Sequence, residues 1–132
     1  MNRVPVMEDE RPRVGADAYP PIEDYGIIGD LRTAALVGRR GSIDFLCFPE
    51  FDSPSVFCAN ADRERGGRFQ IEPMLDEMRE RKLYLPDTNV LITRFLSEQG
   101  IAEVSNYMVV SEEGADCEQA LVRRARCVHG SV

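Results

Sequence analysis

Apolar and polar side chains alternate along several short segments of the chain, with the period of two that is typical of β-strands. Residues 33–37 and 42–48, "TAALV" and "SIDFLCF", predict two strands joined by a three-residue loop that ends at Gly41. Glycine at this last loop position favours the left-handed backbone of a bulge turn. Residues 90–97 and 101–110 repeat the arrangement around a second loop that ends in glycine, "EQG". Two hairpins of one kind predict an antiparallel sheet.

Further strands are predicted at residues 67–73 and 118–130. Two other segments favour short helices instead. Ser53 followed by Pro54 matches a helix N-cap and first helical position, and "MLDEMRERK", residues 74–82, resembles a short polar helical turn. The pattern as a whole predicts a mainly β protein, an antiparallel β-sandwich with one or two short helices.

The organisation along the chain predicts a short arm followed by one domain. Residues 1–18 are polar, contain two prolines and show no strand or helix period, so we expect a flexible arm. Residues 19–132 are long enough for a single core. The sequence ends in "CVHGSV", where a turn follows the last predicted strand and a further strand is expected. We therefore expect an open sheet edge and a homo-oligomer formed through it.

Charge and composition argue against several classes of function. Acidic residues outnumber basic ones, 23 to 16, and the formal charge of −7 disfavours nucleic-acid binding. No apolar run approaches the ~18–20 residues of a membrane helix. The first residues also lack the apolar segment of a secretion signal. We therefore expect a cytoplasmic protein that binds neither nucleic acid nor membrane.

Motifs for metals, cofactors and activated nucleophiles are missing from the sequence. The four cysteines form neither a C-x-x-C pair nor a Cys/His zinc pattern, and no glycine-rich phosphate loop opens a helix. The single histidine, His129, stands near the C-terminus, a weak position for the base of a Ser-His-Asp or Cys-His site. We expect no metal and no cofactor.

Carboxylates are the remaining candidates for catalysis, because glycoside hydrolysis needs only two acids, about 5–10 Å apart. The segment from residue 19 to residue 57 contains six of them: Glu23, Asp24, Asp30, Asp44, Glu50 and Asp52. Each also fits a structural role. We interpret Asp24 and Asp30 as bracketing a turn, and Asp44 as an outward position on a strand. Asp52 and Ser53 are interpreted as the start of a helix.

One long stretch, "PIEDYGIIGDLRTAALVGRRGSIDFLCFPEFDSPSVF", resembles the start of prokaryotic glycoside hydrolase family 15 proteins, the glucoamylase and trehalase group. The similarity continues through "GGRFQIEP", "LYLPDTNVLITRFLSEQGIAEVSNYM" and "LVRRARCVHGSV", so it covers residues 19–132. The positions that carry the motif are Asp24, Gly29, Asp30, Thr33, Gly38, Gly41, Ser42, Ile43, Asp44, Phe51, Asp52, Ser53 and Pro54. The chain is identified on this basis as a trehalase-like N-terminal β-sandwich domain.

The resemblance implies a role in a larger enzyme. In that family a β-sandwich precedes an (α/α)6 barrel, and both catalytic glutamates of the inverting mechanism lie in the barrel. This chain would then be about the first half of the sandwich, with no catalytic residue of its own. Its partners would be an α-glucoside or trehalose substrate in the full-length protein, and the missing catalytic barrel.

Within the motif, the resemblance implies that most positions are structural and that one loop faces the substrate or the barrel. That loop consists of Phe51, Asp52, Ser53 and Pro54. Arginine is common in the family where Glu50 stands, so the charge beside this loop is reversed here.

Three hypotheses stay open at this point. The first is the non-catalytic N-terminal portion of a family 15 glycosidase. The second is a free-standing β-sandwich module that binds carbohydrate or a protein without catalysis. The third, ranked last, is a hydrolase that uses the local carboxylates, because half a sandwich is poorly placed to build a pocket for two acids and a sugar.

Overall fold

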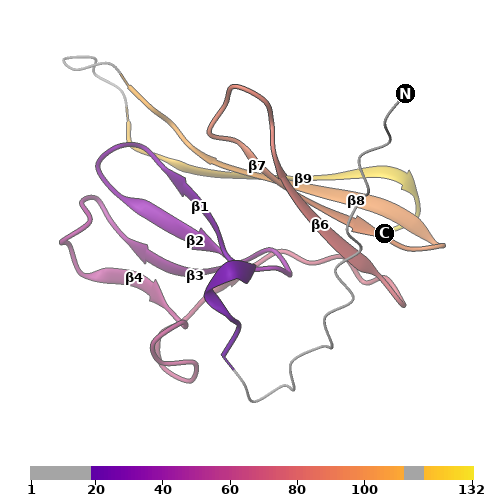
Figure 1. Ribbon diagram of the computed structural model, residues 1–132, viewed down its shortest axis with the longest axis horizontal. Helices are drawn as coiled ribbons and strands as arrows, with labels where there is room; N and C mark the ends of the chain where they lie inside the picture. Colours follow the sequence, from indigo (N-terminus) through magenta and orange to yellow (C-terminus); the bar gives the residue numbers. More distant parts are fainter. Residues whose placement is uncertain (1–18, 112–117) are drawn as a thin grey trace.

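The computed structural model of the chain, shown in Figure 1, describes residues 19–111 and 118–132. The predicted arm, residues 1–18, lies outside the described residues. One sheet contains β1 (Gly26–Gly29), β2 (Ala34–Val37), β3 (Ser42–Cys47), β4 (Ser55–Cys58) and β5 (Phe69–Gln70). The other contains β6 (Arg79–Tyr84), β7 (Leu91–Leu96), β8 (Gly100–Met108) and β9 (Leu121–Gly130).

Both sheets are antiparallel, and neighbouring strands follow one another in the sequence. The order is β1-β2-β3-β4 in the first sheet, where β5 also pairs with β3, and β6-β7-β8-β9 in the second. Figure 1 shows the first sheet in indigo to magenta and the second in salmon to yellow, as two layers. The predicted antiparallel β-sandwich is confirmed.

The core forms between the two sheets. Its larger cluster joins five side chains of the first sheet to two of the second: Ile28, Ala35, Val37, Ile43 and Leu46 with Leu91 and Met108. A second cluster surrounds Phe95 on β7 and includes Leu75 and Met78 from the segment before β6. Burial of each large apolar side chain contributes about 1.5–3 kcal/mol, so this shared core is the main attraction between the sheets.

The first predicted hairpin is confirmed, and the second differs in detail. Gly38 N–H donates to Ser42 O at 2.7 Å, which closes a three-residue loop, and Gly41 has φ 75°. In the second hairpin Ser97 N–H donates to the carbonyl of Gly100, 3.0 Å away, so the loop contains two residues. Gly100 lies inside β8, where an added Cβ would stand 2.7 Å from His129 O. Glycine is needed at position 100 because its lack of a side chain lets β9 pack close to β8, and not because the backbone forms a left-handed turn there.

The two predicted helices are wrong. The segment after Ser53 forms β4, and residues 79–84 form β6. Phe57 of β4 lies opposite Leu46 of β3 and packs against the core, so sheet pairing overrides the local helix signal. The one helix among the described residues is a single 3-10 turn, Ile22–Asp24. No helix in residues 19–111 and 118–132 is long and apolar enough to cross a membrane.

Two interpretations of acidic residues are also wrong; one concerns Asp24 and Asp30, the other Asp44. Asp24 and Asp30 bracket the strand β1, not a turn. Asp44 is buried rather than outward, because Leu36 pairs with Phe45 and Val37 with Ile43, which leaves Asp44 without a partner on β2. A bulge of this kind redirects a side chain. Tyr25 OH donates to the Asp44 carboxylate at 2.8 Å.

Side chains of β6 fix one margin of the sandwich. Lys82 Nζ donates to Val37 O at 3.0 Å and also to Asp24 O. Tyr84 OH donates to Ile27 O at 2.8 Å and accepts from Ile27 N–H at 2.9 Å. Backbone groups at the edge of β1 thereby gain hydrogen-bond partners from the second sheet.

Arg123 of β9 connects the second sheet to the tip of the first hairpin. Its guanidinium donates to Asn106 Oδ1 at 2.8 Å, to Phe69 O at 2.6 Å, and to Gly41 O. It also lies 4.6 Å above the centre of the Phe69 ring. Burial lowers the pKa of Arg123 to about 10, so the cation persists at neutral pH and holds the tip in place.

Lys82 predicts a pH dependence of stability. Burial lowers its pKa from 10.5 to about 8, so between these values the unfolded chain binds more protons than the folded chain. The free energy of unfolding should therefore rise between pH 8 and 9.5, and Lys82→Met should flatten that rise. Urea unfolding at several pH values measures it. Arg81→Met, on the opposite face of the same strand, should keep the wild-type slope; equal slopes in all three proteins would contradict the prediction.

Candidate functional site

The predicted motif positions separate into two groups at opposite ends of β2. Gly38, Gly41 and Ser42 lie at the hairpin tip, with the buried Asp44 beside them. The other group lies where β1 turns into β2 and where β3 leads to β4. We call this group the motif end; it consists of residues 30–33 and 48–54 together with Gln119.

Asp30 organises the turn of the motif end. Its Oδ1 accepts hydrogen bonds from the backbone N–H groups of Arg32, at 3.0 Å, and Thr33, at 2.9 Å. Gln119 Nε2 donates to Asp30 Oδ2 at 2.6 Å and to Pro49 O at 2.6 Å. Burial alone would raise the pKa of Asp30, but these hydrogen bonds outweigh it and hold the pKa below its usual value. The carboxylate is therefore an anchor of structure.

Leu31 sits inside this turn in an unusual conformation. Its φ is 73° and its side chain is 94% exposed. A left-handed backbone in a bulky residue costs on the order of 1–3 kcal/mol, and it persists here because the bonds to Asp30 fix both following residues. The turn thus presents an apolar side chain outward at a cost in stability. Gly29, just before the turn, has no room for a Cβ, which would stand 2.9 Å from Thr33 O.

The loop from β3 to β4 is attached to this turn. Thr33 Oγ1 donates to Cys47 O at 2.5 Å, and Phe51 N–H donates to Arg32 O at 3.1 Å. Arg32 Nε also donates to Glu50 Oε1 at 2.9 Å, so the reversed charge at Glu50 has a partner within the motif end. These bonds hold the two segments as one surface.

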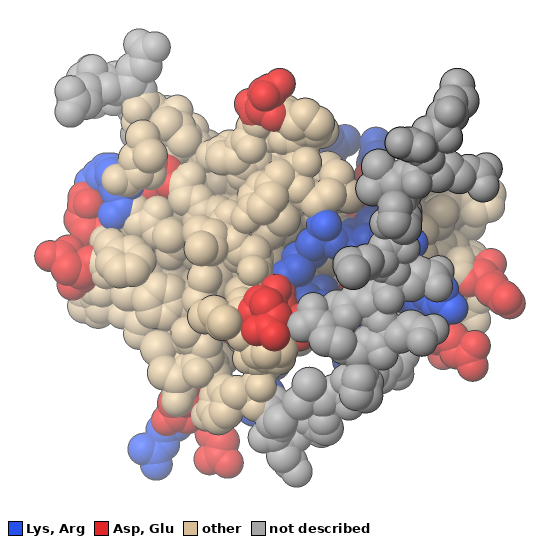
Figure 2. All heavy atoms as spheres, in the orientation of Figure 1, with Lys and Arg blue, Asp and Glu red and all other residues tan. Residues whose placement is uncertain are grey.

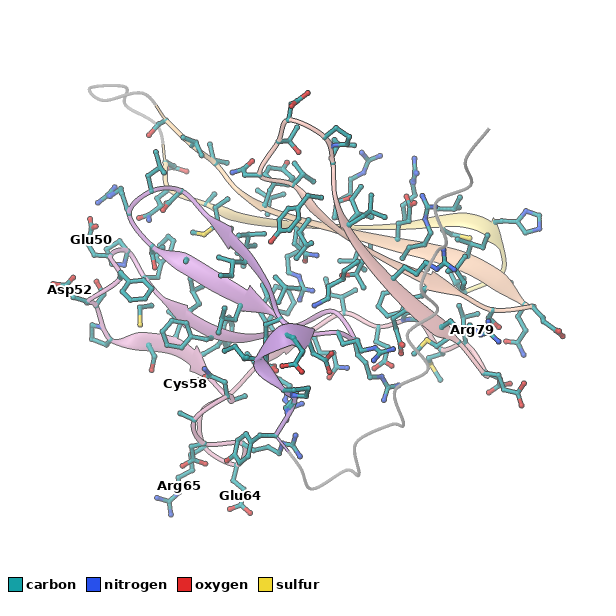
Figure 3. All side chains as sticks on the ribbon, viewed as in Figure 1. Glu50, Asp52, Cys58, Glu64, Arg65 and Arg79 are labelled. Atoms are coloured by element: carbon teal, nitrogen blue, oxygen red, sulfur yellow. The ribbon has the colours of Figure 1, made fainter. Side chains whose placement is uncertain are left out.

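Ser53 and Asp52 do not start a helix. Ser53 Oγ accepts a hydrogen bond from Glu50 N–H at 3.0 Å, and Ser53 N–H donates to Glu50 O at 3.1 Å. These bonds close a tight turn in place of a helix N-cap. Asp52 is exposed and has no hydrogen-bond or ion-pair partner within the described part of the chain. Glu50 and Asp52 both project from the outer margin of the molecule in Figure 3.

The outer surface of the motif end carries two exposed apolar side chains, Leu31 and Phe51. Phe51 is 60% exposed, and its ring centre lies 6.1 Å from that of Phe45. Figure 2 shows that the neighbouring surface over β1 and β2 is mostly uncharged, with acidic and basic side chains gathered at its rim. Single exposed apolar residues are ordinary, but these two stand on a backbone fixed by hydrogen bonds.

Three carboxylates of the motif stretch are engaged in contacts within the chain. Asp30 and Asp44 are buried and accept hydrogen bonds, and Glu50 is paired with Arg32. An inverting glycosidase needs an acid with a raised pKa facing a base across the substrate. The pKa values of Asp30 and Glu103 are both lowered, the opposite of the shift that a catalytic acid needs. Asp30, Asp44 and Glu50 therefore support structure, whereas Asp52 is exposed.

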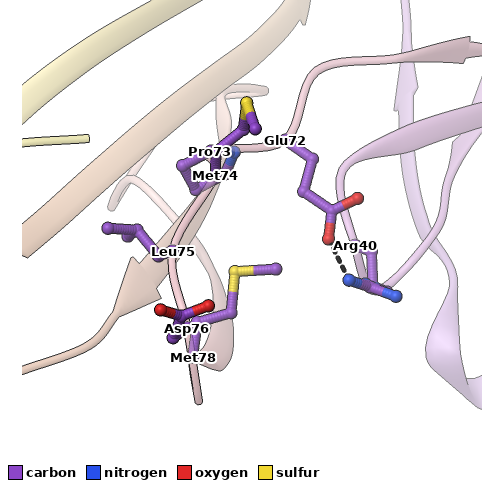
Figure 4. A pocket seen from close by; sticks show the side chains of 7 residues that line it. All are labelled: Arg40, Glu72, Pro73, Met74, Leu75, Asp76 and Met78. Atoms are coloured by element: carbon purple, nitrogen blue, oxygen red, sulfur yellow. Dashed lines mark ion pairs between the residues drawn. The ribbon is translucent and has the colours of Figure 1, made fainter.

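Two surface pockets lie away from the motif end. An open pocket of about 400 Å³, shown in Figure 4, is lined by Arg40, Glu72, Pro73, Met74, Leu75, Asp76 and Met78. Glu72 within it forms an ion pair with Arg40. A smaller pocket of about 140 Å³ lies on the outer face of the second sheet and includes Glu103. In residues 19–111 and 118–132, no group of three or more His, Cys, Asp or Glu side chains is placed to hold a metal ion.

Comparison with known proteins decides the family. A model of the family described as "Trehalase-like, N-terminal" matches residues 8–129. The chain belongs to the trehalase-like N-terminal family. The resemblance of the motif to a trehalase-like N-terminal domain is thereby confirmed.

Relatives of this trehalase-like domain are trehalases of bacteria and archaea. It is 33% identical over 129 residues to a trehalase of Mycolicibacterium smegmatis, covering 86% of the chain and 19% of the relative. It is 42% identical over 105 residues to trehalase 1 of Sulfolobus acidocaldarius, covering 80% and 17%. A trehalase of Thermoplasma volcanium is 37% identical over 103 residues, covering 76% and 16%. The chain spans about a fifth of the length of the first of these relatives. No solved structure matches.

Two residues of the motif end were missed by sequence reasoning. Gln119 lies 89 positions from Asp30 in the sequence, and only the return of the chain between β8 and β9 brings them together. Leu31 looks like an ordinary apolar position, because its left-handed backbone has no glycine or asparagine to signal it. In the trehalase-like domain Leu31 is part of the outward surface of the motif end, and Gln119 anchors Asp30 and Pro49 of the same end.

Proposed function

We propose that this chain is the non-catalytic N-terminal portion of a longer glycoside hydrolase, and that its motif end is the surface on which the remainder of that enzyme docks. We further propose that the longer enzyme belongs to glycoside hydrolase family 15, so that the part which docks on the motif end is the catalytic barrel. Trehalose is the favoured substrate of the whole protein, because the similar proteins are named trehalases. Glucoamylase-type substrates are the other α-glucosides that the family resemblance suggests.

The observation that carries this proposal is the conformation and exposure of Leu31. The turn that holds this strained, outward leucine is fixed by the buried Asp30 carboxylate, to which Gln119 donates. The exposed Phe51 is attached to the same turn, because its N–H donates to Arg32 O. Strain of this kind is retained where a position is used in recognition. An apolar pair on a rigid backbone favours a protein surface over a sugar, which needs a pocket with converging polar groups.

The proposed role of the loop Phe51–Pro54 rests on the same exposed apolar surface of the motif end. Phe51 is the side chain of the loop that faces outward with large apolar area, and Asp52 beside it is exposed. Contact of Phe51–Pro54 with the barrel follows from the docking proposal. Self-association through an open sheet edge stays a prediction, and β9 is the edge strand on which it is to be tested.

Leu31→Asn should affect stability differently in the 132-residue chain and in the longer protein. In the 132-residue chain asparagine adopts a positive φ more readily than leucine, so stability should stay equal or rise by up to about 1 kcal/mol. In the longer protein the substitution removes an apolar anchor, and the midpoint of thermal unfolding should fall. Met74→Asn, at an exposed methionine of the open pocket, is the matched control and should have no effect in either context. The same direction of change in both contexts would contradict docking at the motif end.

The isolated chain should release no glucose from trehalose or maltose, because three carboxylates of its motif stretch, Asp30, Asp44 and Glu50, are engaged in structure. A coupled glucose assay on the purified 132-residue chain measures this. Asp52→Asn serves as the comparison, since Asp52 is the exposed, unpaired carboxylate of the loop. Turnover by the wild-type chain that this substitution abolishes would overturn the proposal in favour of local catalysis.

A further inference from the structure

The docking proposal leaves one group of motif positions without a role, the group at the tip of the first hairpin. It contains Gly38, Gly41, Ser42 and the buried Asp44. Gly41 forms the turn. The other three lie together, because a Cβ at position 38 would stand 2.8 Å from Ser42 Oγ and 3.4 Å from Asp44 Oδ2. Glycine at position 38 therefore leaves room beside a hydroxyl and a buried carboxylate.

The Asp44 carboxylate is only partly satisfied by its neighbours. Asp44 is 5% exposed, and Tyr25 OH donates to its Oδ2 at 2.8 Å. Its Oδ1 is also buried, but has no hydrogen-bond partner within residues 19–111 and 118–132. A buried charged group is costly unless it is paired and hydrogen-bonded, so native structures nearly always supply a partner. The orphaned Oδ1 therefore points to a bound group.

A second orphaned oxygen belongs to the residue beside Asp44. Asn60, in the loop that follows β4, donates its backbone N–H to Asp44 O at 3.3 Å. The Asn60 Oδ1 atom is buried and, like Asp44 Oδ1, has no hydrogen-bond partner in the described part of the chain. Both atoms are acceptors, so neither can satisfy the other. The pair requires a group that donates hydrogen bonds or carries positive charge.

The neighbouring titratable groups do not supply this charge. Burial raises the pKa of Tyr25, the hydrogen bond to Asp44 raises it further, and Arg63 and Arg68 lower it without reversing the rise. Tyr25 thus keeps its single proton, which is given to Asp44 Oδ2. The Arg63 guanidinium lies over the Tyr19 ring, 5.4 Å from its centre, and Arg68 is exposed. The negative charge of Asp44 is left without an ion pair among the described residues.

Size and chemistry favour a small cation with a single charge. Burial of Asp44 leaves no access for a sugar or a nucleotide, and water does not balance the charge. Divalent cations are favoured by several carboxylates, and no group of three or more His, Cys, Asp or Glu side chains in the described ranges is placed to hold a metal ion. One carboxylate and one amide oxygen suit a monovalent cation that prefers oxygen ligands.

We propose that Na⁺ or K⁺ binds between Asp44 and Asn60, with Asp44 Oδ1 and Asn60 Oδ1 as its protein ligands. The cation joins β3 to the loop after β4 and balances the buried carboxylate. This site lies within the first sheet and its own loop, so it goes beyond the proposed function and does not depend on what docks at the motif end.

Thermal unfolding of the 132-residue chain in NaCl, KCl and choline chloride tests the site. All three salts are used at the same ionic strength, so the screening of surface charges stays equal, and choline is too large to enter. We expect the midpoint of unfolding to rise by about 3 °C or more when about 300 mM choline is replaced by Na⁺ or K⁺. Sodium NMR on the same chain should show a broadened line, because bound Na⁺ relaxes faster than free Na⁺.

Asp44→Asn separates a cation site from a carboxylate that serves structure alone. The amide still accepts from Tyr25 and can donate to Asn60 Oδ1, so the variant should fold in choline chloride and lose its response to Na⁺ and K⁺. Asn60→Ala repeats the test should Asp44→Asn fail to fold, and should lower the response by about half or more. Glu64→Gln is the matched control. It removes the same charge from an exposed position of the same loop (Figure 3) and should keep the full response.

Three results would overturn the proposal. Equal midpoints of unfolding in the three salts would indicate a buried water, or an Asn60 amide turned so that its NH₂ group donates to Asp44. An equal response to Na⁺ in the wild-type chain and in Asp44→Asn would mean that the cation binds elsewhere. A larger rise in CaCl₂ than in NaCl at equal ionic strength, abolished by Asp44→Asn, would indicate a divalent cation.

Discussion

Two half-buried cations of the second sheet, Lys82 and Arg123, hold the backbone of the first, and the geometry of the rest depends on them. Lys82 bonds to the carbonyls of Asp24 and Val37, and Arg123 bonds to those of Phe69 and Gly41. The apolar core attracts the two sheets without fixing their alignment, since hydrophobic attraction is non-directional. Hydrogen bonds from cations to named carbonyls are directional, so they set how β1 and the first hairpin lie over the second sheet. The position of the motif end follows from that alignment.

The dense motif is explained mainly by structural requirements at the two ends of β2. At one end Gly41 supplies the left-handed turn, and its carbonyl receives Arg123. At the other end, Asp30 accepts hydrogen bonds from the backbone N–H groups of Arg32 and Thr33, and these bonds fix Leu31 in its strained turn. Gly41 thus forms a turn, Asp30 caps a turn, and Thr33 bonds the turn to the neighbouring strand. The side chains left to face outward, Leu31 and Phe51, carry the proposed function.

Local sequence patterns correctly predicted features that depend on neighbouring residues. They failed for features that depend on pairing with strands distant in the sequence. Alternation and a terminal glycine were sufficient for the first hairpin, because a three-residue turn depends on its own residues. The residues after Ser53 carry a helix signal but pair with β3, so tertiary contact determined that strand. Asp44 was placed outward because strict alternation ignores a bulge. Gln119 reaches Asp30 from far along the chain, and no short-range pattern indicates it.

Hydrogen exchange tests most directly whether the motif end is a docking surface. The measurement compares amides of residues 30–33 and 48–54 in the 132-residue chain with the same amides in the longer protein. Exchange there should be slower in the longer protein, while Arg39 and Arg40 at the opposite hairpin tip should exchange equally in both. Equal exchange at the motif end in the two proteins would contradict the proposed docking.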